Sequence, residues 1–182
     1  ITLDNLSVAE NSPGAHVANI SGTDPDGDVL TYHILGEMRH WFVVLPSGDM
    51  LHLASGVSAD YEANSQLEVQ LQATDPDGLS FSKLVTIEVT DINETPTNIT
   101  LSSSATQENS AAGTLVGNLS ATDPDVGDTH SFSVVGGTGS NLFEINASNQ
   151  LAVKSGASLD YETLANPTVA IRITDSGGLS FD

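Results

Sequence analysis

The stretch Asp91-Ile92-Asn93-Glu94-Thr95-Pro96 separates two copies of one sequence pattern. It follows an alternating apolar run at residues 84–90. The landmarks that return in order are Ile1-Thr2-Leu3 as Ile99-Thr100-Leu101, Glu10-Asn11-Ser12 as Glu108-Asn109-Ser110, Asp24-Pro25-Asp26 as Asp123-Pro124-Asp125, Asp60-Tyr61-Glu62 as Asp160-Tyr161-Glu162, and Asp75 as Asp175. A nearly constant offset of about 100 residues indicates two homologous domains and not a short solenoid repeat. We therefore predict a first domain at residues 1–95, a second at 96–182 and a linker at 91–96.

The length and composition fit two ordinary globular domains. A chain of 182 residues gives each copy enough length to bury a core of its own. Cysteine is absent, which excludes disulfides, thiolate metal sites and a cysteine nucleophile. No apolar run approaches the roughly 18 residues needed to cross a bilayer, and no signal peptide precedes Ile1. We expect a mature fragment without membrane insertion.

The charge is strongly negative, with 24 Asp and Glu against 4 Lys and Arg, a formal net charge of −20. Nucleic acid is not an expected partner, because phosphate binding needs clustered cations. Acidity alone is also typical of merely soluble, halophilic or disordered chains. Here, however, hydrophobic residues make up 38% and alternate, and the acids gather at repeated loop positions. That distribution favours binding of hard cations.

Apolar and polar residues alternate with period two, which predicts strands separated by Gly- and Asp-containing turns. The strands expected in the first copy are 1–8, 16–21, 29–35, 41–45, 50–54, 67–74 and 81–90, and those in the second are 113–121, 130–135, 142–145, 150–153 and 169–174. Seven short strands in the roughly 100 residues of the first copy, a pattern that the second copy repeats in part, indicate an all-β fold of two tandem seven-stranded antiparallel Greek-key β-sandwiches of immunoglobulin-like architecture. The second copy ends before a counterpart of residues 83–90, so we expect it to lack its last strand and to expose a sheet edge that invites strand association.

Calcium takes six to eight oxygen ligands, and one loop supplies that number only when it is specialised for the purpose. The segment from Asp24 to Asp28 begins like an EF-hand loop. The sixth position is nevertheless Val29 and the twelfth is Leu35, where an EF-hand needs Gly and Glu. Calcium ligands would instead have to converge from several loops at one end of a sandwich.

Five acidic motifs resemble those of cadherin repeats. They are Ala9-Glu10-Asn11, Asp24-Pro25-Asp26, Asp60-Tyr61-Glu62, Ala73-Thr74-Asp75 and the linker at residues 91–96. Each motif is weak alone, whereas five in the family's order, four of them repeated, are specific. The Asp-Pro-Asp-x-Gly spelling and the acidic, cysteine-free composition further resemble the cadherin-like repeats of large bacterial surface adhesins.

The resemblance implies a cluster of three calcium ions between consecutive repeats. Carried over motif by motif, the implied ligands are Glu10, Asp60 and Glu62 of the first copy, Asp91, the carbonyl of Ile92, Asn93 and Glu94 of the linker, and Asp123, Asp125 and Asp175 of the second copy. Gly127 or Asp128 would supply a further oxygen. Glu94 stands where the family has Asp, and the linker is one residue short. Clustered carboxylates repel one another without metal, so the linker should be loose without calcium and rigid with it.

Two equivalent sets of acids lie at the outer ends of the copies. They are Asp24, Asp26 and Asp75 in the first copy and Glu108, Asp160 and Glu162 in the second. Each set lacks the neighbouring repeat or linker that would complete it. We expect weak calcium sites at most.

The resemblance implies a calcium-rigidified, non-catalytic module of an extracellular, cell-surface protein that supports cell–cell or cell–matrix adhesion. The expected partners are calcium and either another copy of the chain or an extracellular polysaccharide. The alternative is a calcium-dependent carbohydrate-binding module of a secreted or surface protein, which an aromatic content of only 5% disfavours. An enzyme is not expected, since no Gly-x-Ser-x-Gly elbow exists and the paired carboxylates are explained as metal ligands. The five histidines show no convincing repeat and no His-Glu-x-x-His motif, so a transition-metal site is not expected either.

Overall fold

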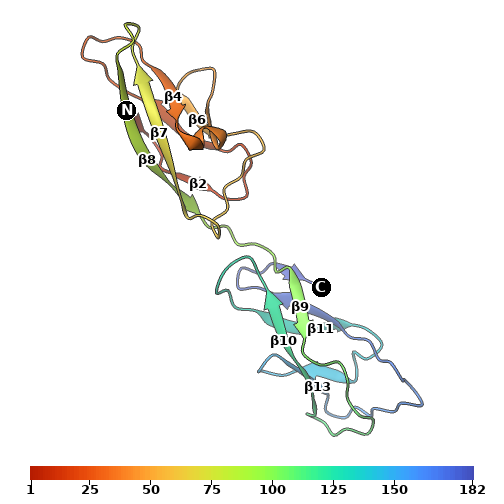
Figure 1. Ribbon diagram of the computed structural model, residues 1–182. Coiled ribbons are helices and arrows are strands. Elements are labelled where there is room, and N and C mark those ends of the chain that lie inside the picture. Colours follow the sequence, from red (N-terminus) through yellow and green to blue (C-terminus); the bar gives the residue numbers. More distant parts are fainter. The chain divides into compact units, whose positions relative to one another are not determined.

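The computed structural model describes all 182 residues and separates into two compact units, Ile1–Ile92 and Asn93–Asp182 (Figure 1). Both units are built from strands, and the sole helical element is a short 3-10 helix, η1, at Glu37–His40. No helix has the length and apolar character that a membrane crossing requires. The predicted all-β class is confirmed.

Unit 1 is a sandwich of two four-stranded sheets. The first sheet has the order β1-β3-β6-β5, made of β1 (Thr2–Leu3), β3 (His16–Ser21), β6 (Met50–Leu53) and β5 (Phe42–Val44). The second has the order β2-β8-β7-β4, made of β2 (Ser7–Ala9), β8 (Ser80–Thr90), β7 (Gln66–Thr74) and β4 (Thr31–Leu35). Each of these strands lies at or within two residues of a predicted strand, except at the start of the chain.

The strand predicted at residues 1–8 is split between the two sheets, which corrects the prediction. β1 pairs antiparallel with β3, whereas β2 runs parallel to β8, with Ser7 opposite Glu88. At this break a side chain, and not the backbone of a strand, donates the hydrogen bonds to neighbouring carbonyl groups. Asn5 Nδ2 donates to the carbonyls of Ser7 (2.6 Å) and Val17 (2.8 Å), so the chain leaves the first sheet at this point.

The core of unit 1 lies between its sheets and follows the predicted alternation. In β7 the side chains of Leu67, Val69 and Leu71 are buried while the intervening residues are exposed. Val69 lies opposite Val85 and Leu67 opposite Ile87 in the β7–β8 ladder, so these pairs form an apolar face on this part of the ribbon. Burial of apolar area, at about 25 cal/mol per Å², is the main force that holds the two sheets together.

Unit 2 repeats the architecture with a smaller second sheet. One sheet has the order β12-β13-β10-β9, made of β12 (Phe143–Ile145), β13 (Gln150–Val153), β10 (Leu115–Thr122) and β9 (Asn98–Leu101). The other has the order β11-β14-β15, made of β11 (Ser131–Gly136), β14 (Ala170–Thr174) and β15 (Ser180–Phe181). Its core contains Val116, Phe143, Leu151, Val153 and Leu159. β15, the counterpart of β8, has two residues, and no strand corresponds to β2.

Candidate metal centre

In unit 1 the fold brings three predicted ligands together. Glu10 follows β2 directly, and Asp60 and Glu62 lie in the turn that precedes β7. One potential ligand atom from each of the three lies within 4.8 Å of the others. Glu10 is only 2% exposed, whereas Asp60 and Glu62 are exposed. The trio therefore combines one fixed, buried carboxylate with two that solvent and ions reach.

The Glu10 carboxylate is held by the backbone of two other segments of unit 1. Its Oε2 accepts a hydrogen bond from the Tyr61 amide and its Oε1 accepts one from the Ile92 amide, both at 2.8 Å. The Glu10 amide itself donates to the Thr90 carbonyl at 3.2 Å. Carboxylate oxygens carry further lone pairs, so these bonds orient the group and still leave acceptor capacity for a cation. Glu10 thus holds the backbone at Ile92 and keeps acceptor capacity for a cation.

The remaining predicted ligands of unit 1 follow β8 directly. Asp91 is exposed, and Ile92 is exposed by 47% while its amide is bound by Glu10. Five of the ten predicted ligands therefore belong to unit 1, namely Glu10, Asp60, Glu62, Asp91 and Ile92.

In unit 2 the predicted ligands come from two turns, one after a strand of each sheet. Asp123 and Asp125 lie in the turn after β10, where the Asp125 amide donates to Asp123 Oδ1 at 3.2 Å. Asp175 follows β14, is 6% exposed, and accepts the Leu179 amide at Oδ1 (2.8 Å). Backbone amides close both turns on a carboxylate, which fixes the side chains without neutralising them.

These carboxylates also bind the start of unit 2. The Glu94 amide donates to Asp125 Oδ2 at 2.7 Å. The Asn93 side-chain amide donates to Asp175 Oδ2 at 3.0 Å. The first two residues of unit 2 are therefore fastened to the same acidic loops that the sequence predicts as metal ligands.

One oxygen in this group lacks a partner. Asp125 Oδ1 is buried and accepts no hydrogen bond, while Oδ2 of the same carboxylate accepts the Glu94 amide. An unsatisfied buried carboxylate oxygen is costly, and a hard divalent cation is the natural partner for it. The donor set consists of carboxylate and amide oxygens, which suits calcium. The partnerless Asp125 oxygen and the oxygen donors around it therefore fit a calcium ion.

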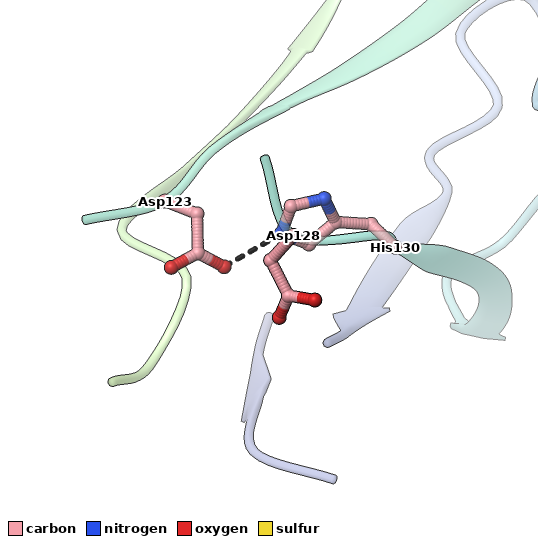
Figure 2. A group of neighbouring side chains, drawn as sticks. All are labelled: Asp123, Asp128 and His130. Carbon is pink, nitrogen blue, oxygen red and sulfur yellow. Dashed lines mark hydrogen bonds and ion pairs between the residues drawn. The ribbon is translucent and has the colours of Figure 1, made fainter. Parts of the chain in front are cut away.

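The structure also places a histidine, His130, beside the predicted ligand Asp123, and the sequence analysis did not predict this contact. Figure 2 shows Asp123, Asp128 and His130 side by side, and their potential ligand atoms lie within 4.8 Å of one another. His130 Nε2 lies 2.6 Å from Asp123 Oδ2. Asp128 was expected as a possible oxygen donor. His130 immediately precedes β11, and the residue at the matching position before β4 in unit 1 is Leu30. Because the histidine is not repeated, comparison of the two copies could not identify it.

Hydrogen bonds also set the ionisation of Asp128. The Ser176 hydroxyl, followed by the Thr129 amide, holds the pKa of this carboxyl below its ordinary value. Ser176→Ala is therefore expected to raise the pKa of Asp128 towards that value in the calcium-free protein, as measured by an NMR titration of the carboxyl carbon. Since a lowered pKa stabilises the fold above about pH 4 and the effect is lost as pH falls, the variant should be less acid-sensitive than the parent. An unchanged pKa, or the same change in the exposed-strand control Ser133→Ala, would contradict this.

The two outer sets of acids differ from each other. Glu108, Asp160 and Glu162 lie within 4.8 Å of one another, but all three are exposed, unlike the buried Glu10. Hydrogen bonds from the Thr163 side chain and amide lower the pKa of Asp160. In unit 1 the Asp26 amide donates to Asp24 Oδ1 (2.8 Å) and the Leu79 amide to Asp75 Oδ1 (2.9 Å). These two bonds repeat those of Asp123 and Asp175, so the turns form in the same way in both units.

Comparison with known proteins agrees with this arrangement. A family model described as "Cadherin domain" matches residues 102–180. The chain is 33% identical over 181 residues to cadherin-related family member 1 of Gallus gallus, covering 95% of this chain and 20% of that protein. It is 30% identical over 175 residues to cadherin-8 of Rattus norvegicus, covering 87% of this chain and 22% of that protein. The chain thus spans about a fifth of the length of these relatives.

Solved structures show the same architecture. The structure titled human protocadherin-24 EC1-2 Form II matches with a TM-score of 0.76 and 25% identity, covering 95% of this chain and 83% of that one. Extracellular cadherin domains 3–6 of protocadherin gamma B2 match in fold, with a TM-score of 0.73 and 20% identity. The named relatives are animal cadherins and not enzymes, which confirms the expectation of a non-catalytic chain. They are also not bacterial, so the resemblance to bacterial adhesins stays a prediction.

Proposed function

We propose that this chain, whose two units share the cadherin-type β-sandwich fold, is a calcium-rigidified adhesion module of an extracellular, cell-surface protein. Calcium binds its acidic loops and orders the linker, and the ordered pair of domains transmits adhesive contacts along a longer protein. The finer part of the proposal, a large bacterial-type surface protein, rests on the Asp-Pro-Asp-x-Gly spelling and the acidic composition alone.

The observation that carries the proposal is the binding of successive linker residues by carboxylates. Within unit 1, Glu10 holds the Ile92 amide. Within unit 2, Asp175 holds the Asn93 side chain and Asp125 holds the Glu94 amide. Three adjacent residues of the chain are thus attached to acidic groups, one of which has a buried oxygen without a partner. This pattern supports a metal site whose occupancy governs the linker.

The calcium ligands we propose are the ten that the sequence predicts. They are Glu10, Asp60, Glu62, Asp91, the carbonyl of Ile92, Asn93, Glu94, Asp123, Asp125 and Asp175. Two like charges 4 Å apart repel by about 1 kcal/mol in water and about 4 kcal/mol at the effective dielectric constant of a protein surface. The chain has only four Lys and Arg to offset 24 acids, and Arg172 is already paired with Asp182. Calcium would offset the repulsion among the carboxylates that lie close together within a unit, such as Glu10, Asp60 and Glu62.

Among the expected partners, the comparisons favour a second copy of the chain. A matching solved structure, of protocadherin gamma B7, is titled a cis-dimer structure, and another contains extracellular cadherin domains. We propose that the present chain likewise works outside the cell and contacts a second copy of itself, with an extracellular polysaccharide as the other candidate partner.

Calorimetric titration of calcium into chelator-stripped protein tests the proposal. We expect tight uptake of more than one equivalent, weakened at least tenfold by Asp91→Ala, because each lost carboxylate removes charge and an oxygen ligand. Residual dipolar couplings should then report one common alignment of the two units with calcium and two independent alignments without it. The matched control is Asp77→Ala, an exposed turn residue outside the ligand set. Binding only at millimolar calcium, or equal binding by Asp91→Ala, would refute the proposal.

A further inference from the structure

We propose that His16 and His52 form a binding site for a divalent transition metal on the outer face of the first sheet of unit 1. This site lies apart from the acidic loops. Sequence spacing gave no hint of it, because the two histidines belong to different strands. The register of the β3–β6 ladder brings them together, with His16 directly opposite His52.

The two rings lie at the distance that a shared metal ion requires. Their centroids are 4.9 Å apart with an interplanar angle of 75°. Imidazole nitrogens bind zinc at about 2.0–2.1 Å, which puts each ring centroid about 3.2 Å from the ion. Coordination angles between about 90° and 109° then give centroid separations of about 4.5–5.2 Å. The observed distance falls inside this interval, so the spacing of the two rings is compatible with one shared ion.

A second observation concerns the tautomer of His52. Its Nδ1 lies 3.3 Å from the Gly14 carbonyl oxygen, which can only accept a hydrogen bond. In this bond Nδ1 carries the proton, and the lone pair is left on Nε2. Metal-binding histidines are commonly oriented in this way by a backbone carbonyl. The contact therefore prepares His52 as a neutral nitrogen ligand.

The surroundings suit a cation that solvent can reach. Burial alternates along β6, with Leu51 and Leu53 in the core and His52 on the opposite, part-buried face. His16 is exposed at the start of β3. Asp4 lies near this face, where the Asn19 side chain and amide donate to its carboxylate at 2.7 Å and hold its pKa below the ordinary value, with His16 a smaller influence. An ion held by both rings would link β3 to β6.

The ligand class follows from the donor atoms. Two imidazole nitrogens favour Zn²⁺, Ni²⁺ or Cu²⁺, whereas calcium selects oxygen ligands. Saturating calcium should consequently leave this site open, and water molecules would complete the coordination. Because the folded ladder is needed to bring the two histidines together, bound metal should also stabilise unit 1 against unfolding.

Zinc calorimetry on the whole, calcium-saturated chain tests the inference. We expect one saturable zinc site whose affinity falls at least tenfold in His16→Gln and equally in His52→Gln. The double variant should bind no more weakly than the worse single variant, because either loss destroys the two-ligand site. Side-chain NMR should show zinc perturbing Nε2 of His52 in the parent chain. His16 is exposed, so its variant should fold, and an amide spectrum checks this.

The controls separate this site from other zinc binders. His40→Gln removes an exposed histidine of η1, and His130→Gln removes the histidine beside Asp123 and Asp128. Both variants should keep the zinc affinity of the parent. Loss of zinc binding in either control, or unchanged binding in folded His16→Gln, would overturn the inference. None of these outcomes depends on whether calcium orders the linker.

Discussion

Glu10→Ala is expected to lower the free energy of unfolding of unit 1 by about 3 kcal/mol in the absence of calcium, since hydrogen bonds to charged groups contribute about 1.5–3 kcal/mol each. Two such bonds disappear, and the amides of Tyr61 and Ile92 are left without their acceptor. Calcium affinity should fall at least tenfold as well, because the carboxylate is one of the proposed ligands. Urea unfolding with chelator, followed through NMR signals of unit 1, measures the first effect, and calorimetry measures the second.

The control for this variant is Glu68→Ala, which removes an exposed glutamate from the outer face of β7. Its unfolding free energy and calcium affinity should match those of the parent chain within about 0.5 kcal/mol. Equal behaviour of the Glu10 and Glu68 variants would mean that the buried carboxylate neither holds the backbone nor binds metal.

Asp125→Asn is expected to change stability in opposite directions with and without calcium. Without the ion, the substitution removes one negative charge beside Asp123 and stabilises unit 2 by about 1 kcal/mol. With calcium in excess, the variant should be the less stable protein, because a tenfold loss of affinity costs about 1.4 kcal/mol of binding free energy. Thermal unfolding of unit 2 in chelator and in saturating calcium measures both signs.

The matched control for Asp125→Asn is Glu144→Gln, which removes one negative charge at an exposed position of β12 in the same unit. Its small effect should be similar in both conditions. A single sign for Asp125→Asn in chelator and in calcium would show that the unpartnered oxygen of this carboxylate is not a metal ligand.

Local alternation made most of the fold predictable. In β7 and β8 the side-chain period of two is visible in the sequence itself, and the buried face follows directly from it. The division of the first strand into β1 and β2 was not predictable, because it depends on Asn5 reaching the Val17 carbonyl across the sheet. Contacts of that kind arise only once the strands are in register.

The candidate site also combines features that the sequence predicts with features that only the folded structure shows. The order of the acidic motifs predicted Glu10 and Asp175 as ligands, but not that Glu10 would hold the Ile92 amide. The pair His16 and His52 escaped notice for another reason, since residues opposite each other in a ladder have no fixed spacing along the chain. Sequence patterns therefore predicted which residue types gather in loops, and the structure added what each of them holds.

The parallel pairing of β2 with β8 has a mechanical consequence for the proposed adhesive role. Ser7, Val8 and Ala9 near the start of unit 1 lie beside Glu88, Val89 and Thr90 at its end, and both strands run in the same direction. Tension applied through the two ends of the unit would slide these strands past each other, so that the hydrogen bonds share the load and do not open one after another. Unit 1 should for this reason resist stretching more strongly than a hairpin pulled apart from one end.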